Sequence, residues 1–429
     1  MSPPSETQKS PLLAMSIIGG MFFIFGFVTW LNGPLITFVQ LAFTLSDVEA
    51  FLVVTVFYMS YFFLALPSAA ILKKTGMKKG MALGLLVMAV GAAIFGQLAT
   101  MRIFEGALTG LFIIGAGLAL LQTASNPYIS ILGPINSAAQ RIAFMGICNK
   151  IAGILAPIVV GGLVLNGVGE FAAQVEAATD PVAREALLDA FAQKIHLPYL
   201  GMAALLAVLA FAVAKSPLPE ISDQANESSA SDTTGKSIFA FPQLWLGFVA
   251  LFCYVGVEVM AGDAIGTYGA AFGIPLDITK YFTSFTLVGM LIGYVVGLII
   301  IPRFISQERY LAISAVLGVA FCLGAYLTHG LVSVGFVAAL GFANAMMWPA
   351  IFPLGIKGLG KFTETGSAIL IMGIAGGAVL PQLFAHFKGS FDFQAVFAVI
   401  MIPAYLYILV FALFAITQSA KAKAASVNY

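Results

Sequence analysis

Apolar residues occupy this chain in runs long enough to cross a lipid bilayer, and short polar stretches separate the runs. A membrane-spanning helix needs roughly 20 mostly apolar residues. Twelve segments meet that requirement, and we expect spanning helices at about residues 14–40, 48–72, 80–99, 104–132, 142–167, 197–215, 241–270, 279–302, 309–328, 332–356, 365–387 and 394–417. The pattern predicts an all-α membrane protein with twelve transmembrane helices.

Two of the polar connectors are longer than the rest. Residues 168–196 are charged and rich in helix-forming residues, so we expect them to form an amphipathic excursion outside the membrane. Residues 216–240 are rich in serine and aspartate, a composition typical of a flexible linker. This linker divides the chain into an N-terminal six-helix half, residues 1–215, and a C-terminal six-helix half, residues 241–429.

Basic residues are concentrated in alternate connectors. With the N-terminus inside, the predicted cytoplasmic connectors carry most of the lysine and arginine, including the cluster Lys73, Lys74, Lys78 and Lys79. Short cytoplasmic connectors of membrane proteins are enriched in these residues. We therefore expect both chain termini and the linker at 216–240 to lie in the cytoplasm.

Parts of the two halves are similar in sequence. Residues 126–133 read NPYISILG and residues 348–355 read WPAIFPLG, each near the end of the fourth span of its half. In the next span of both halves, Ile-Ala-Gly precedes a proline, at residues 151–157 and 374–381. Chance similarity between glycine- and proline-rich apolar segments is the alternative. The ordered recurrence favours two pseudo-symmetric halves in the same orientation, as in the major facilitator fold.

Composition agrees with a membrane protein and argues against several other classes. Hydrophobic residues make up 60% of the chain and charged residues only 9%, whereas soluble domains carry about 25% charged residues. The net charge of +1 gives no reason to expect a nucleic-acid partner. The three cysteines and three histidines show no spacing typical of a metal site. We therefore expect no enzyme activity, no resident metal and no cofactor.

One acidic residue, Glu258, lies inside an expected span, where a charged side chain costs roughly 2.5–3.5 kcal/mol on insertion scales. A carboxylate at this depth is typical of a site that binds a proton or a sodium ion. The alternative is a static ion pair with Lys150, the basic residue at depth in the fifth span. An ion pair that opens when a cation binds would combine the two interpretations. Asp263 is a second coupling candidate, unless it only reaches the outer vestibule. Lys150 could hold Glu258 ionised or donate to a substrate hydroxyl.

Amide and aromatic side chains form a second group of candidates. Gln122 and Asn126 are four residues apart on the fourth span, as are Asn344 and Trp348 on the tenth, so each pair would share a helix face. The repeat makes Gln122 and Asn344 equivalent, and we expect them to face each other. Further candidates are Asn32, Asn149, Tyr254 and Gln382. Amides with aromatic rings suit a neutral polyhydroxylated ligand; the alternative is hydrogen bonding between helices.

Small residues and prolines affect how closely helices pack, where they bend and how the two halves could move relative to each other. Gly289, Gly293 and Gly297 recur at every fourth position of the eighth span. Such a stripe permits close helix contact, which would serve either rocking of the halves or simple tight packing. Pro127 and Pro349 are expected to kink the fourth and tenth spans near their inner ends.

Three segments resemble a known family. LLQTASNPY at residues 120–128, FPLGIKGLG at 352–360 and LFCYVG at 251–256 are similar to the bacterial fucose–galactose–glucose porters of the major facilitator superfamily, within the glucose/galactose transporter branch. The likeness extends over all twelve spans. It implies a monomeric, multi-pass sugar:cation symporter of the bacterial inner membrane that works by alternating access. The implied substrate is a hexose-type monosaccharide: glucose, galactose, mannose or N-acetylglucosamine.

The sequence departs from the related L-fucose:proton symporter at its membrane acids. That protein carries acids on the first and fourth spans, where this chain has Gly33 and Gln122. In exchange, Glu258 stands where the fucose symporter has an amide. The loop at residues 72–79 lacks the aspartate usual in the superfamily, with Lys73 near its place. The glucose/galactose branch that the chain resembles includes sodium-coupled members. Together with the missing proton-carrying acids, the resemblance favours sodium as the coupling ion, bound transiently at Glu258, with the proton as the alternative.

Other functions remain open on the sequence. A facilitative sugar uniporter or an efflux carrier for apolar compounds would share the predicted fold, although an efflux cavity should lack the amide group. A membrane-embedded enzyme would need a nucleophile, base and metal constellation, which the sequence does not suggest. A sugar sensor would be expected to carry a signalling domain.

Overall fold

The computed structural model describes residues 11–131, 138–218 and 237–427, and every regular element in these ranges is helical. Twelve helices or consecutive helix pairs are long and apolar enough to cross a membrane. The prediction of an all-α protein with twelve spans is therefore confirmed. Most of the expected linker at 216–240 lies outside the described residues.

The N-terminal half contributes six spans. They are α1 and α2 (Pro11–Thr29, Asn32–Ala42), α3 and α4 (Asp47–Ala50, Leu52–Thr75), α5 (Met77–Thr100), α6 (Phe104–Ile131), α7 (Ala138–Leu163) and α10 (His196–Lys215). Between α7 and α10 the chain forms two further helices, α8 (Val168–Ala177) and α9 (Pro181–Gln193).

The C-terminal half contributes the other six spans. They are α11 and α12 (Pro242–Gly262, Ile265–Ala270), α13 and α14 (Leu276–Thr279, Phe282–Ile300), α15 (Gln307–Leu327), α16 and α17 (Gly330–Asn344, Met347–Ile356), α18, η5 and α19 (Thr363–Met372, Gly373–Ala375, Gly376–Phe387) and α20 (Phe393–Val427). Short 3-10 turns, η3 (Ile238–Ala240) and η4 (Gly360–Phe362), precede α11 and α18.

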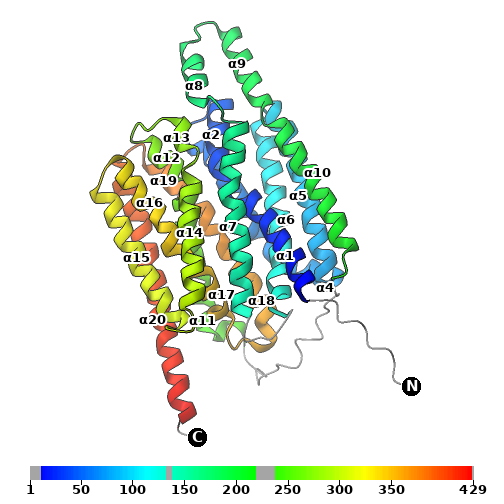
Figure 1. Ribbon diagram of the computed structural model, residues 1–429, viewed down its shortest axis with the longest axis vertical. Helices are drawn as coiled ribbons and strands as arrows, with labels where there is room; N and C mark the ends of the chain where they lie inside the picture. The colour runs from blue at the N-terminus through cyan, green and yellow to red at the C-terminus, as the bar shows by residue number, and fades with distance from the viewer. Residues whose placement is uncertain (1–10, 132–137, 219–236, 428–429) are drawn as a thin grey trace.

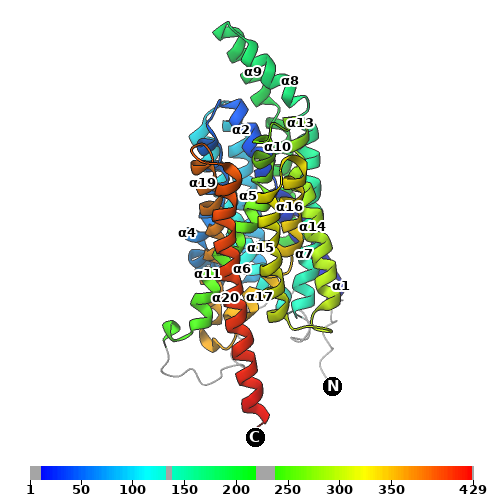
Figure 2. The same cartoon turned by 90° about the vertical axis from the view of Figure 1, so that its left-hand side faces the viewer.

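The helices α8 and α9 project beyond the spans at one end of the molecule, which we call the hairpin end (Figure 1). The first turn of α1 and the last turns of α20 lie at the opposite end, the termini end (Figure 2). The hairpin is fixed to the bundle because Arg102 forms ion pairs with Glu185 and Asp189 of α9. Phe191 of α9 also stacks on Phe38 of α2. The excursion predicted at 168–196 is therefore present, and it lies outside the spans.

Of the spans that are divided into consecutive helices, three are interrupted well inside their length. The gap between α16 and α17 falls at Ala345 and Met346. Pro349 explains it, because its ring has no N–H and would clash with the carbonyl of Ala345, four residues earlier. The kink predicted at Pro349 is confirmed as a break. The other interruptions are at Trp30 and Leu31, between α1 and α2, and at η5, between α18 and α19.

The glycine stripe of α14 packs within the C-terminal half. A methyl group at Gly293 would lie 2.7 Å from the carbonyl oxygen of Phe342, and one at Gly289 would lie 3.1 Å from that of Ala338, both on α16. Since α14 and α16 belong to one half, this stripe serves tight packing inside that half. Of the two interpretations the sequence allowed, the structure favours simple packing.

Candidate substrate and coupling site

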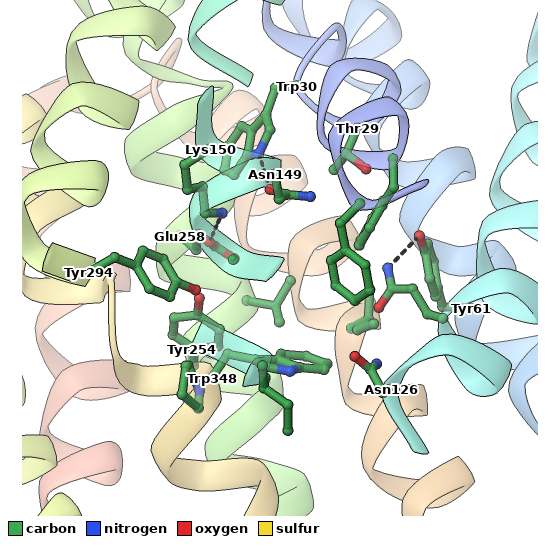
Figure 3. A pocket seen from close by; sticks show the side chains of 18 of the residues that line it. Thr29, Trp30, Tyr61, Asn126, Asn149, Lys150, Tyr254, Glu258, Tyr294 and Trp348 are labelled. Atoms are coloured by element: carbon green, nitrogen blue, oxygen red, sulfur yellow. Dashed lines mark hydrogen bonds and ion pairs between the residues drawn. The ribbon is translucent and has the colours of Figure 1, made fainter. Parts of the chain in front are cut away.

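A cavity is lined by residues of both halves, and Figure 3 shows it from close by. About 760 Å³ of space there, including the part open to solvent, is not filled by protein atoms. The residues that line it are Phe22, Phe25, Thr29, Trp30, Tyr58, Tyr61, Gln122, Asn126, Ile142, Gly146, Asn149, Lys150, Tyr254, Val255, Glu258, Tyr294, Trp348, Pro349 and Ile374. Both halves contribute, and the lining combines aromatic rings with a few polar groups.

An ion pair between Lys150 and Glu258 joins the halves across this cavity. Lys150 Nζ of α7 lies 2.9 Å from Glu258 Oε1 of α11. Their side chains are only 8% and 12% exposed, so the pair is largely removed from solvent. Removing one partner of a buried pair typically costs 3–5 kcal/mol, because the other charge is left without compensation. The two residues that the sequence placed at membrane depth therefore depend on each other.

A tryptophan in the interrupted first span completes the surroundings of Lys150. The indole Nε1 of Trp30 donates a hydrogen bond to Oδ1 of Asn149, at 3.3 Å. The Lys150 ammonium lies 4.4 Å from the centroid of the Trp30 ring, within the range of a cation–π interaction. Lys150 thus contacts both a carboxylate and an aromatic face.

The N-terminal half supplies the amides of the cavity. Gln122 and Asn126 both line it from α6, as their four-residue spacing predicts. Gln122 Nε2 donates to the hydroxyl of Tyr61 on α4, at 3.1 Å, which fixes the orientation of the amide. Thr29 also lines the cavity, and its buried hydroxyl has no hydrogen-bond partner among the described residues. This wall therefore offers several groups that can donate or accept hydrogen bonds.

The C-terminal half supplies an aromatic surface. Trp348 of α17 stacks on Phe352, with ring centroids 5.7 Å apart. Tyr254 of α11 lies against Trp348, at 6.5 Å between centroids, and Tyr294 of α14 lines the cavity beside them. Figure 3 shows these rings on the side of the cavity opposite Tyr61. Such a surface suits the apolar face of a ring-shaped ligand.

Four of the predicted site residues do not line the cavity: Asn32, Asp263, Asn344 and Gln382. The expectation that Gln122 and Asn344 face each other is wrong. Asn344 is fully buried, and its Oδ1 accepts a hydrogen bond from the Tyr405 hydroxyl at 2.7 Å. The reason is the break between α16 and α17, which puts Asn344 and Trp348 on separate helices that do not share one face.

Asp263 and Gln382 instead join the halves at the hairpin end. Asp263 is 1% exposed; its Oδ1 accepts from the backbone N–H of Gly33 at 3.1 Å. The Tyr58 hydroxyl donates to Asp263 Oδ2 at 3.5 Å. Gln382 donates to the carbonyl of Val48 and accepts from the Thr55 hydroxyl, both at 3.0 Å. Asn32, next to Gly33, is buried at 1% exposure.

Further polar contacts join the two halves at the hairpin end. Lys388 of the C-terminal half forms an ion pair with Asp47 of the N-terminal half. Lys280 donates to the carbonyl of Leu165 at 2.8 Å. Asp277 Oδ2 accepts from the backbone N–H of Gly169 at 3.0 Å. Together with the bonds of Asp263 and Gln382, these contacts hold the halves together between the cavity and the hairpin.

Most of the aromatic residues that line the cavity could not be identified from the sequence. Phe22, Phe25, Tyr58 and Tyr61 were missed because an aromatic residue in a span looks the same whether it faces lipid, a neighbouring helix or a cavity. Trp30 carried the best available signal, because it lies in mid-span two residues from Asn32. Polar residues at that depth suggest a non-lipid environment.

Twelve spans in two halves that enclose a cavity lined by aromatic rings and a few polar groups define a membrane transporter. The chain belongs to the Major Facilitator Superfamily, whose sequence profile matches residues 18–380. It is therefore a multi-pass membrane transporter and not an enzyme. This confirms the family that the sequence motifs indicated.

Individual relatives place the chain near the fucose–galactose–glucose porters. A protein of Brucella abortus biovar 1 named glucose/galactose transporter is 30% identical over 412 residues, covering 95% of each chain. The L-fucose-proton symporter of Escherichia coli K12 is 29% identical over 381 residues, covering 87% of this chain and 86% of its own. The crystal structure of FucP, a transporter of the same superfamily in the outward conformation, matches with a TM-score of 0.75 and 27% identity, over 95% of this chain and 99% of its own.

Proposed function

We propose that this protein carries a neutral hexose-type sugar into the bacterial cell together with a proton, by alternating access. The relatives named glucose/galactose transporter and L-fucose-proton symporter support a sugar as the substrate. In this proposal residues 1–215 and 241–429 form the two moving halves, and 216–240 is the cytoplasmic linker between them.

The observation that carries the proposal is the ion pair of Lys150 and Glu258 inside a cavity that also holds amides and aromatic rings. These are the charged residues of the cavity lining. A proton that neutralises Glu258 removes one partner of the pair, so the link between α7 and α11 weakens when the proton binds. Proton binding is thereby tied to the contact between the two halves.

The substrate chemistry follows from the two walls. Gln122, Asn126 and Asn149 can each donate and accept hydrogen bonds, which matches the paired donor and acceptor character of sugar hydroxyls. Trp348 and Tyr254 offer rings on which the C–H face of a pyranose can stack. We therefore assign sugar binding to these five residues and leave Asn32, Asn344 and Gln382 out of the binding site.

The surroundings of Glu258 favour a proton over the sodium ion expected from the sequence. A cation at Glu258 Oε1 would compete with the Lys150 ammonium 2.9 Å away, and the two positive charges would repel each other. A proton adds to the carboxylate without needing a shell of oxygen ligands. Relatives in Escherichia coli and Haemophilus influenzae are named L-fucose-proton symporters.

The contacts at the hairpin end serve as a gate in this proposal. The distribution of basic residues supports a hairpin end outside the cell, and the gate bonds of Asp263, Gln382 and Lys388 would then open before sugar enters from outside. We assign Asp263 to this gate because both of its carboxylate oxygens face the N-terminal half. At the termini end, Lys73 and Glu364 form an exposed ion pair at 3.2 Å, which is expected to add little to the closure of that side.

The test is uptake of labelled glucose, galactose, mannose and N-acetylglucosamine into proteoliposomes, with proton and sodium gradients imposed one at a time. We expect at least one of these sugars to accumulate when a proton gradient is imposed and to stop when the gradient is collapsed. Accumulation driven by sodium alone would overturn the proton assignment. Equilibration of sugar without accumulation under either gradient would identify a uniporter.

A further inference from the structure

Trp30 lies where the first, fifth and seventh spans meet. It occupies the gap between α1 and α2 and is 2% exposed. A methyl group at Gly153 of α7 would lie 2.5 Å from its Cδ1, and one at Gly262 of α11 would overlap its Cζ3. Glycine at both positions therefore lets the two helices approach the indole, and the ring is held between them.

The position of the ring is matched to Lys150. Trp30 Nε1 donates a hydrogen bond to Asn149, the residue immediately before Lys150. This bond fixes the position of the ring relative to the segment of α7 that carries Lys150. Figure 3 shows the Lys150 side chain between Trp30 and Glu258. The ammonium lies 2.9 Å from the carboxylate and 4.4 Å from the ring centroid. The Glu258 carboxylate can lose its charge by taking up a proton, whereas the charge of the Trp30 ring cannot change.

We propose that Trp30 is a positioning residue that holds the Lys150 ammonium while a proton occupies Glu258. This inference rests on the proposed proton coupling at Glu258. Once that carboxyl is neutral, the described residues that line the cavity offer the ammonium no other carboxylate. A tryptophan face is the most favourable aromatic partner for a cation in such a place. The ring thereby lowers the free-energy cost of separating Lys150 from Glu258, so the proton binds more readily.

The other ionisable groups around the pair do not replace the ring. Tyr58, Tyr61, Tyr254 and Tyr294 line the cavity with neutral hydroxyls. Asp263, five residues beyond Glu258, also interacts electrostatically with Lys150, but the hydrogen bonds of its carboxylate oxygens come from Gly33 and Tyr58. Among the described residues, Trp30 is therefore a contact of Lys150 whose charge does not change when Glu258 takes up a proton.

The first test compares Trp30→Leu with Trp30→Phe in proteoliposomes. Proton-driven uptake is measured as a function of pH, beside sugar exchange in the absence of a gradient. Trp30→Leu removes the ring face, so we expect the pH midpoint of uptake to move about one unit toward acid, a roughly tenfold weaker affinity for the proton. Trp30→Phe keeps a ring but loses the bond to Asn149, so its midpoint should lie between those of the wild type and Trp30→Leu. Equal midpoints for the wild type and Trp30→Leu would contradict the inference.

A second test does not depend on transport. Thermal unfolding of the purified protein in detergent is compared for Trp30→Leu in the wild-type and Glu258→Gln backgrounds. In the Glu258→Gln background the ring is the remaining partner of Lys150, so Trp30→Leu should lower the unfolding temperature more there than in the wild type. An equal loss in both backgrounds would show that Trp30 acts only through packing.

The two tests separate this inference from the proposed function. If the wild type shows no proton-driven sugar uptake, the proposed function fails, and the unfolding experiment still reports whether Trp30 and Lys150 are coupled. If the wild type does show such uptake while neither the pH midpoint nor the unfolding difference responds to Trp30→Leu, the positioning role fails and the transport function stands.

Discussion

The fourth and fifth spans can be compared with their repeats, the tenth and eleventh. The sequences share Asn-Pro or Trp-Pro segments and an Ile-Ala-Gly motif, yet the N-terminal copies are the continuous helices α6 and α7. The C-terminal copies are divided into α16 and α17, and into α18, η5 and α19. A shared sequence pattern therefore does not ensure that equivalent positions point in equivalent directions.

Because of this difference, the two halves contribute different side chains to the cavity. On α6, Gln122 and Asn126 both face the cavity, because a continuous helix keeps residues four apart on one side. In the tenth span, Trp348 lines the cavity while Asn344 is buried and bonded to Tyr405. The N-terminal half thus provides the amides and Lys150. The C-terminal half provides the acid, and both halves contribute aromatic rings, with Tyr254, Tyr294 and Trp348 on the C-terminal side.

The largest expected effect comes from the acid of the C-terminal half. Glu258→Gln keeps the side chain's size but cannot exchange a proton, so gradient-driven sugar accumulation should be abolished while exchange without a gradient persists. Labelled-sugar uptake and counterflow in proteoliposomes measure the two activities. Glu364→Gln, an acid of the same half that is exposed in a surface ion pair, is the matched control and should accumulate sugar normally. Normal accumulation by Glu258→Gln would contradict the coupling role assigned to the acid of the C-terminal half.

The next largest effect concerns the interrupted eleventh span. Gly376, at the start of α19, lies so close to α11 that a methyl group there would overlap the carbonyl oxygen of Phe252. Gly376→Ala should therefore lower the stability by about 1–3 kcal/mol, the usual cost of overpacking. Thermal unfolding in detergent measures this loss.

Gly162 on α7 provides the control for Gly376. A methyl group at Gly162 meets nothing within 4 Å, so Gly162→Ala should leave the stability unchanged or raise it by up to about 1 kcal/mol, because alanine favours a helix. Equal destabilisation by the two variants would show that the approach of α19 to α11 is not specially tight.

A smaller effect separates the two equivalent amides. Gln122→Ala removes a cavity hydrogen bond worth about 0.5–1.5 kcal/mol, so the sugar concentration for half-maximal exchange should rise up to about tenfold. Asn344→Ala should leave that concentration unchanged and instead lower the unfolding temperature, because the buried Tyr405 hydroxyl loses its partner. Exchange kinetics together with thermal unfolding make the comparison. If both variants weaken sugar binding equally, the amides are equivalent after all.

The smallest effect is expected from the aromatic wall. Trp348→Leu keeps apolar contact but loses the stacking face, so sugar affinity should fall about two- to fivefold, as for an aromatic contact of roughly 0.5–1 kcal/mol. Trp245, which stacks on Phe239 away from the cavity lining, is the control, and Trp245→Leu should bind sugar normally. Unchanged affinity in Trp348→Leu would assign the stacking role to Tyr254 or to neither ring.

The fold was predictable because each span carries its own signal. A run of about 20 apolar residues predicts a spanning helix without knowledge of its neighbours. Glu258 and Lys150 were also predictable, because charges at depth need a partner or a cavity. The direction of Asn344 was not, since it depends on a break set by Pro349 and on the packing of α20. The burial of Asp263 and Gln382 at the hairpin end depends on contacts with residues more than 200 positions away.

The ion pair between Lys150 and Glu258 also has an electrical consequence. As a pair its net charge is zero, so an empty carrier moves its cavity across the membrane field without electrical work. With a proton on Glu258, the charge of Lys150 is no longer balanced, and the loaded cavity carries one positive charge. Moving one elementary charge through the full field corresponds to about 2.3 kcal/mol per 100 mV. In the proposed proton-coupled cycle, a potential that is negative inside therefore drives the loaded carrier inward and leaves the return of the empty one to thermal motion.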